Sequence, residues 1–148
     1  MTMTEGAITK NFYVKELRVS AQHSELAQKI EITPLIFNTA KLLLESCWQP
    51  VRDRFGLINV NSFVRSPELN ALVGGTENSD HLIGAAMDGT PKESTCFEVF
   101  KWIAKNKLPY RQVIYYVEFD FIHMSINTPG KKFKNEAFLL RQKEKIYY

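Results

Sequence analysis

Cysteine, glycine and proline are scarce in this sequence, and long hydrophobic runs are absent. Two cysteines occur, Cys47 and Cys96, each within an apolar helical pattern, which excludes a disulfide framework and a CxxC metal or redox pair and predicts two buried free thiols. The seven glycines and six prolines are scattered, so no low-complexity linker is expected. No segment approaches the roughly 18 consecutive apolar residues that a membrane span needs. The sequence therefore predicts no membrane partner.

An apolar signal segment and a broad excess of one charge are also lacking. Residues 1–10 are polar, so we expect synthesis in the cytoplasm without a signal peptide. The net charge is +3, but residues 130–148 alone carry six Lys and Arg against two Glu, a net +4. The basic character thus belongs to a C-terminal segment, expected as a solvated basic tail, and a nucleic-acid-binding face is not expected.

What the sequence does contain is the profile of one folded domain over residues 1–148, expected as a monomer: 45% of the residues are hydrophobic and 24% are charged. Patterning and capping signals predict helices over 24–30, 33–55, 67–73 and 94–106, strands over 57–63, 112–118 and 121–126, and a short strand or entry turn over 12–17. The last two long strands are close enough to form a hairpin. Incomplete alternation of helices and strands favours an α+β fold with a small antiparallel sheet flanked by helices.

Histidine occurs only three times, and two of the three fit a metal site. His81, Asp88 and His123 offer two imidazoles and one carboxylate, a set that Zn²⁺ accepts in tetrahedral geometry with the fourth position open for catalysis. Gly84 permits a close backbone approach between the first two of these residues. His123 lies in an apolar strand, where a lone imidazole is more often a hydrogen-bonded core residue. From the residues alone, both interpretations of His123 stay open.

Two sequence patterns resemble a known family. Ser79, His81, Gly84, Ala86 and Asp88 match SxHxxGxAxD, and residues 62–70, SFVRSPELN, match S-x-x-R-S-P-x-L-N. Both patterns resemble the D-Ala-D-Ala carboxypeptidase family of zinc peptidases, which includes vancomycin-resistance dipeptidases and phage L-alanyl-D-glutamate endopeptidases and shares its metal fold with the hedgehog signalling domain. The resemblance covers roughly residues 12–127. It implies a hedgehog-like fold, Zn²⁺ held by His81, Asp88 and His123, and hydrolysis of peptidoglycan stem peptides.

The same resemblance implies roles for four further residues. Asp120, three residues before the last histidine, corresponds to the general base, with Glu118 as a competitor because some relatives place the acid farther upstream. Arg65 corresponds to the arginine that holds the substrate carbonyl or carboxylate, and Ser79 binds the substrate backbone or supports its loop. Both acids lie an odd number of residues from His123. On an unbroken strand they would face away from it, so a turn or bulge must realign whichever one acts.

Two departures from the family pattern keep a second interpretation open. Phe121-Ile122 stands where relatives often have Trp before the last histidine, and Tyr116 stands where many relatives have an acidic residue. The alternative function is therefore a non-catalytic binding or structural module that zinc stabilises. If the protein is a peptidase, the lack of a signal peptide suggests a phage lytic enzyme acting on the cell wall, or a cytoplasmic peptidase that recycles wall fragments.

Overall fold

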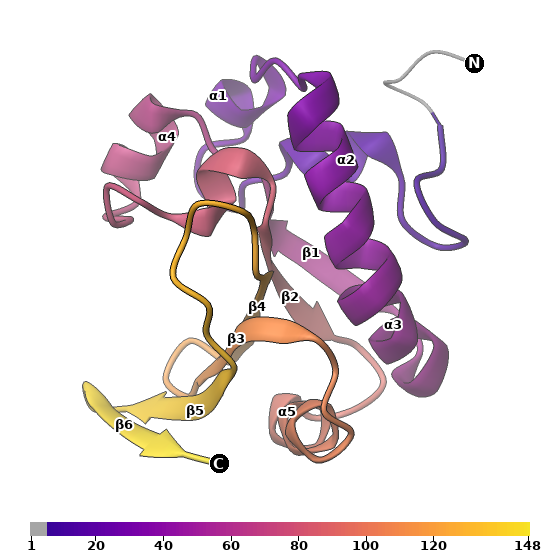
Figure 1. Cartoon of the computed structure of the whole chain (residues 1–148), viewed down its shortest axis with the longest axis vertical. Coiled ribbons are helices and arrows are strands. Elements are labelled where there is room, and N and C mark those ends of the chain that lie inside the picture. The colour runs from indigo at the N-terminus through magenta and orange to yellow at the C-terminus, as the bar shows by residue number, and fades with distance from the viewer. Residues whose placement is uncertain (1–5) are drawn as a thin grey trace.

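A six-stranded sheet organises the molecule, and its strand order is β1-β2-β4-β3-β5-β6 (Figure 1). The computed structural model describes residues 6–148, so the first half of the polar segment 1–10 lies outside the described residues. The strands are β1 (Ile58–Ser62), β2 (Ala86–Pro91), β3 (Tyr110–Tyr116), β4 (Phe121–Ile126), β5 (Glu136–Arg141) and β6 (Glu144–Tyr147). The expected mixture of helices and strands is confirmed.

The expected small antiparallel sheet is wrong in size and type. Four neighbouring pairs are antiparallel, but β5 runs parallel to β3, with Val113 opposite Ala137 and Ile114 opposite Phe138, so the sheet is mixed. The expected solvated tail also differs, because β5 and β6 lie within residues 130–148. Ala137, Phe138 and Leu139 are buried, and this short apolar run outweighs the charged residues on either side of it.

The predicted helix over 33–55 is present as a continuous helical stretch with a wide turn inside it. It consists of α2 (Pro34–Leu43), the π-helical turn η2 (Leu44–Trp48) and α3 (Gln49–Phe55). The Thr33 hydroxyl accepts a hydrogen bond from the Ile36 amide at 3.2 Å, and Pro34 occupies the first turn. Pro50 has no N–H to donate to the Ser46 carbonyl. The Gln49 amide donates to the Leu44 carbonyl, one residue farther back than the Glu45 carbonyl that an α-helix would use.

The other predicted elements are found with small changes of boundary. The predicted strand over 57–63 is β1, and the helices are α1 (Ser24–Gln28), α4 (Pro67–Leu72) and α5 (Cys96–Lys105). Most of residues 12–17, predicted as a short strand or entry turn, belong to the 3₁₀ helix η1 (Val14–Arg18), so the strand alternative is wrong. Strand β2 was not predicted. Its sequence, AMDGTP, shows little apolar alternation because Gly89 stands where the core face would have a second apolar side chain, while Asp88 and Thr90 face the cleft.

One face of the sheet packs in the hydrophobic core, and the other carries polar side chains. On one face Met87, Ile122 and Met124 are fully buried beneath α5 and the α2–α3 stretch, and Gly89 leaves room for the Trp48 ring (Figure 1). The other face carries polar side chains from β1, β2 and β4 beside α4 and the 3₁₀ helix η3 (Asp80–Ile83). Among residues 6–148, no helix is both long and apolar enough to cross a membrane.

Candidate metal centre and cleft

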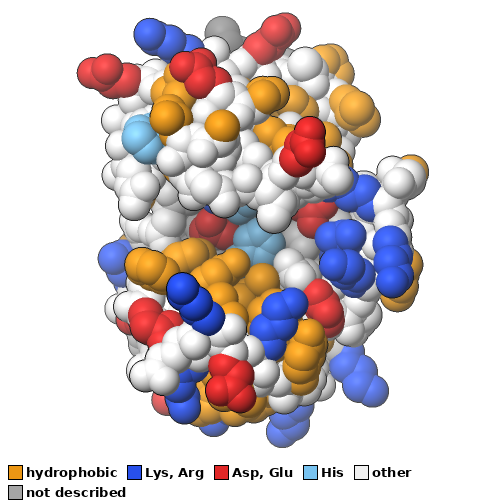
Figure 2. Space-filling view, turned by 90° about the vertical axis from the view of Figure 1, so that its left-hand side faces the viewer, with side chains coloured by type: hydrophobic (Ala, Val, Ile, Leu, Met, Phe, Trp, Pro, Cys, Tyr) orange, Lys and Arg blue, Asp and Glu red, His pale blue; other side chains and the backbone are white. Residues whose placement is uncertain are grey.

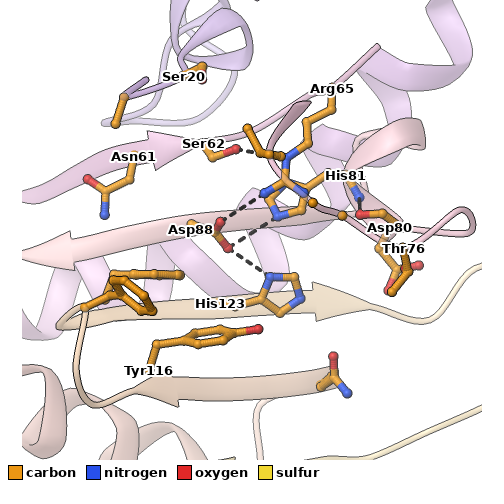
Figure 3. Close-up of a pocket in the computed structure, with 18 of the residues that line it drawn as sticks. Ser20, Asn61, Ser62, Arg65, Thr76, Asp80, His81, Asp88, Tyr116 and His123 are labelled. Carbon is orange, nitrogen blue, oxygen red and sulfur yellow. Dashed lines mark hydrogen bonds and ion pairs between the residues drawn. The ribbon is translucent and has the colours of Figure 1, made fainter. Parts of the chain in front are cut away.

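Two imidazoles and one carboxylate converge on the polar face of the sheet. His81 comes from η3, Asp88 from β2 and His123 from β4, and one possible ligand atom from each lies within 4.8 Å of the others. Asp88 Oδ1 is 2.9 Å from His123 Nδ1 and 3.3 Å from His81 Nε2, between the two rings (Figure 3). The sheet register explains part of this, because Asp88 and His123 are directly opposite each other on β2 and β4.

The short helix η3 fixes both the position and the tautomer of His81. The Ser79 hydroxyl accepts a hydrogen bond from the His81 amide at 3.2 Å, and Gly84 ends the turn in the left-handed region at φ +77°. His81 Nδ1 lies 2.6 Å from the Phe63 carbonyl oxygen, which can only accept, so Nδ1 carries the proton. The Nε2 lone pair therefore faces Asp88, and this buried atom has no hydrogen-bond partner among residues 6–148. An orphaned imidazole nitrogen beside a carboxylate fits a divalent cation such as Zn²⁺.

The charge states suit cation binding. Burial lowers the pKa of His81 below its ordinary value, although the Asp88 carboxylate opposes the change, so the imidazole is held neutral with its lone pair free. Burial acts to raise the pKa of Asp88, but the two imidazoles outweigh it and hold that pKa well below its usual range. The carboxylate therefore stays ionised at neutral pH.

The three residues lie at the floor of a cleft with a cavity volume of about 1160 Å³. Figure 2 shows this hollow across the middle of one face, with a histidine at its floor and hydrophobic side chains gathered directly below. The cleft lining includes the stacked pair Tyr116 and Phe121, whose ring centroids are 4.7 Å apart, and the exposed Phe119 ring next to Phe121. A substrate in this cleft would contact both the polar triad and an aromatic wall.

The model of one protein family, Peptidase M15, matches residues 10–125. This chain belongs to the Peptidase M15 family. The matched segment contains all three residues of the triad, and it ends before the loop that follows β4 and before β5 and β6. No curated protein matches this M15 peptidase. The resemblance drawn from the sequence patterns is thus confirmed at the level of the family, whereas the relation to the hedgehog domain stays a prediction.

Arg65 and Ser79 both line the cleft of this M15 peptidase. The Arg65 guanidinium is 3.5 Å from Asp88 Oδ2, and it donates hydrogen bonds to Ser62 and Asn70 at 3.3 Å each (Figure 3). These contacts hold a permanent positive charge beside the triad. Ser79 is occupied as the cap of η3, so its hydroxyl supports the His81 loop.

The two candidate bases are placed differently. Asp120 ends the tight turn between β3 and β4 at φ +55° and lines the cleft, and its Oδ1 accepts a hydrogen bond from the Tyr115 hydroxyl at 3.2 Å. Tyr115 is opposite Ile122 and therefore shares the core face of the sheet, not the face of His123. Glu118 Oε1 accepts from the Gln142 amide at 2.6 Å, at the turn between β5 and β6, and does not line the cleft. The catalytic roles of Asp120 and Glu118 stay predictions.

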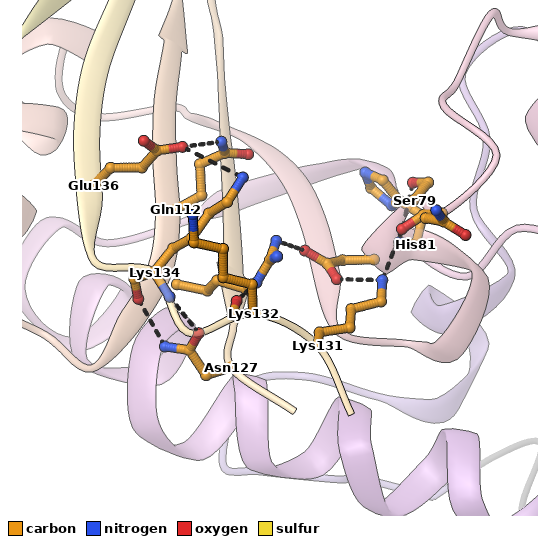
Figure 4. Close-up of polar contacts among 11 residues, drawn as sticks. Ser79, His81, Gln112, Asn127, Lys131, Lys132, Lys134 and Glu136 are labelled. Atoms are coloured by element: carbon orange, nitrogen blue, oxygen red, sulfur yellow. Dashed lines mark hydrogen bonds and ion pairs between the residues drawn. The ribbon is translucent and has the colours of Figure 1, made fainter. Parts of the chain in front are cut away.

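Sequence reasoning missed a charged clamp that holds the loop of His81. Asp80 is buried, and its two carboxylate oxygens bind Arg111 Nη1 at 3.0 Å and Lys131 Nζ at 2.7 Å. Lys131 also donates to the Asn78 carbonyl at 2.7 Å, which joins the loop after β4 to the loop before His81 (Figure 4). Only the adjacency of Asp80 to His81 was visible in the sequence, because Arg111 and Lys131 are distant along the chain.

We expect the variant Asp80→Asn to bind zinc about tenfold more weakly, since groups that orient a metal ligand typically contribute 10- to 100-fold to affinity. Loss of the charge removes the ion pairs of Arg111 and Lys131 with residue 80 and loosens the turn that carries His81. Competition with a fluorescent chelator measures the change. Asp53→Asn, on the exposed side of α3, is the matched control. Equal affinities in the two variants would show that the clamp does not position His81.

Proposed function

We propose that this M15 peptidase hydrolyses amide bonds in peptidoglycan stem peptides with Zn²⁺ held by His81, Asp88 and His123. The observation that carries the proposal is the convergence of three ligand atoms within 4.8 Å at the floor of a cleft large enough for a peptide. The orphaned Nε2 of His81 supports the metal, because a buried imidazole nitrogen without a partner is costly unless a cation binds it. The peptidase family supports hydrolysis as the reaction.

A bound zinc ion acts as a Lewis acid and lowers the pKa of a water molecule toward about 7. Arg65 is positioned to orient the substrate carbonyl and to stabilise the negative charge that develops on its oxygen, because its guanidinium lies beside Asp88 at the cleft floor. Ser79 holds the His81 loop by accepting from the His81 amide, which leaves the O–H of its hydroxyl to donate to a carbonyl of the substrate backbone.

Asp120 is the general base of this proposal. Of the three carboxylates that line the cleft, Asp80 is bound by two cations and Asp88 lies between the imidazoles, whereas Asp120 makes one hydrogen bond, to Tyr115. Rotation of the Asp120 side chain away from Tyr115 would bring the carboxylate toward the cleft. There it would accept a proton from the attacking water and pass the proton to the leaving amine.

The experiment is digestion of purified peptidoglycan with zinc-loaded protein, followed by mass spectrometry of the released muropeptides. Wild type is expected to cut one type of stem-peptide bond. Asp120→Asn is expected to lower kcat by about 10²- to 10⁴-fold at unchanged zinc content, as for loss of a general base. Glu118→Gln is the matched control, because glutamine can still accept from Gln142, and its kcat should stay within about twofold of wild type.

Three results would contradict parts of this assignment. Inactivity of Glu118→Gln with an active Asp120→Asn would transfer the role of base to Glu118. Zinc-loaded wild type that binds peptidoglycan without cutting it would instead support a zinc-stabilised binding module, the alternative that Tyr116 at the family's acidic position suggests. Activity on other peptides but not on peptidoglycan would leave a metallopeptidase with a different substrate.

A further inference from the structure

The two ends of the cleft differ in charge. Uncharged side chains line the end near β1, namely Ser20, Gln22, Asn61, Ser62 and Thr90, whereas Arg111, Gln112 and Lys134 line the other end. In Figure 2, Lys and Arg side chains gather at one end of the hollow. The Asp120 carboxylate also lines the cleft, and the Asp120 carbonyl lies 3.5 Å from the Thr90 hydroxyl. An elongated substrate therefore meets polar and anionic groups on one side of the metal centre and cationic groups on the other.

The cations that line the cleft are not equally free to bind a ligand. Arg65 is 3.5 Å from Asp88, and Arg111 is 3.0 Å from Asp80. The Lys134 ammonium has only Glu136, at 4.0 Å, and that carboxylate already accepts a hydrogen bond of 2.6 Å from the Gln112 amide. Within the described part of the chain, Lys134 is thus the cleft-lining cation with the weakest ion pair.

The backbone of Lys134 is fixed although its side chain is free. The Asn127 side chain donates to the Lys134 carbonyl at 2.8 Å and accepts from the Lys134 amide at 3.0 Å (Figure 4). This two-point contact holds the loop after β4 so that Lys134 stands at the cleft wall, with 38% of its side chain exposed. A backbone that is fixed in advance lowers the part of the entropic cost of anion binding that comes from ordering the loop.

We propose that the Lys134 ammonium and the second N–H of the Gln112 amide, the one that does not bond to Glu136, form a subsite for a carboxylate group of the substrate, which sets the direction in which the peptide lies across the metal centre. An ammonium and an amide N–H are both donors that a carboxylate accepts, and the charged donor makes the stronger bond. The subsite rests on the proposed function, because stem peptides carry free carboxylates on their glutamyl residue and at their C-terminus. It is built by residues on both sides of the end of the family match, since Lys134 and Asn127 lie beyond residue 125.

The test compares three synthetic stem peptides: one with both carboxylates free, one with the glutamyl carboxylate amidated, and one with the C-terminal carboxylate amidated. Initial rates give KM and kcat of zinc-loaded protein for each peptide, and calorimetry gives the equilibrium affinity for any peptide that is not hydrolysed. One of the two amidated peptides is expected to bind wild type about tenfold more weakly than the parent, as for loss of one charge-assisted hydrogen bond. The difference should shrink at high ionic strength.

Three variants assign the effect to Lys134. Lys134→Met, which keeps the unbranched apolar part of the side chain and removes the charge, should bind the parent about tenfold more weakly and no longer distinguish it from the amide. Lys134→Arg should restore the preference. Lys132→Met is the matched control, because Lys132 is exposed two residues away and does not line the cleft, and it should behave as wild type.

The outcomes separate this proposal from the proposed function. Hydrolysis of all three peptides with equal affinity, or a preference that survives in Lys134→Met, would overturn the subsite and leave the peptidase assignment intact. A preference in binding that depends on Lys134, without hydrolysis of any peptide, would support the subsite and overturn the peptidase assignment. Failure of all three peptides to bind would contradict both.

Discussion

Replacement of His81 by alanine is expected to remove zinc binding and with it nearly all peptidase activity. The substitution deletes the buried Nε2 that has no other partner and leaves one imidazole and one carboxylate. A Lewis acid contributes several kcal/mol to transition-state stabilisation, so a loss of about 4 kcal/mol corresponds to a rate lower by about 10³-fold. Zinc content by atomic absorption and kcat/KM on peptidoglycan fragments measure the two effects.

The same variant is expected to lose the dependence of stability on metal. Zinc at 100 times its dissociation constant adds about 2.7 kcal/mol to the free energy of unfolding, which a chelator removes from wild type and cannot remove from His81→Ala. His23→Ala is the matched control, because His23 precedes α1 and lies outside the triad. Asp88→Asn, which preserves the side-chain volume, should also lose metal dependence. Equal chelator sensitivity of wild type and both triad variants would show that these residues do not hold the metal.

Gly84→Ala is expected to destabilise the protein by about 3 kcal/mol, the sum of a left-handed backbone cost of about 1–2 kcal/mol and a packing cost of similar size. Gly84 has φ +77°, and a Cβ there would lie 2.9 Å from the Ile36 carbonyl oxygen and 3.1 Å from Ile36 Cγ2. Relief of this contact requires a shift between α2 and the turn that carries His81. We therefore also expect weaker zinc binding. Urea unfolding of the chelated protein measures the stability term alone.

Gly130→Ala separates the two costs. Gly130 has a similar dihedral angle, φ +86°, but no atom lies within 4 Å of the point that a Cβ would occupy there. Its substitution should cost only about 1–2 kcal/mol, since the backbone term remains and the clash does not. A Gly84→Ala variant no less stable than Gly130→Ala would mean that the neighbourhood of α2 adapts freely, and the expected effect on zinc binding would then fail as well.

Local signals in the sequence were sufficient for most of the helices. The Thr33-Pro34 and Ser66-Pro67 pairs each form the expected N-terminal cap, and the residues after them form the expected helices. The β3–β4 hairpin was predicted because its strands are rich in β-branched and aromatic residues. These elements are specified by residues close together along the chain, which is why pattern reasoning found them.

Elements defined by distant partners were not predicted. Strand β2 consists mainly of small or polar residues and becomes a strand because β1 and β4 pair with its two edges. Strand β5 lies in a charged segment, and its burial depends on a parallel partner more than twenty residues earlier in the chain. Local propensity is a weak guide where tertiary pairing decides the conformation.

The candidate site, too, was predicted from local patterns only where its residues stand close together in the sequence. His81 and Asp88 stand in one short pattern, whereas His123 was assigned through the family resemblance and not through its own surroundings. No sequence pattern predicts the clamp on Asp80 or the contact between Asn127 and Lys134. Such contacts join segments whose spacing is set only by the folded chain.

The position of β2 between β1 and β4 has a consequence for the order in which the protein folds. Asp88 and His123 come together only when β4 pairs with β2, and α5 and β3 lie between these two strands in the sequence. The metal centre therefore depends on contacts between distant parts of the chain. Contacts of this kind form late and slowly, because the intervening segments must first lose their freedom. Zinc would thus bind after most of the sheet has formed. It would stabilise the native state and would not nucleate folding.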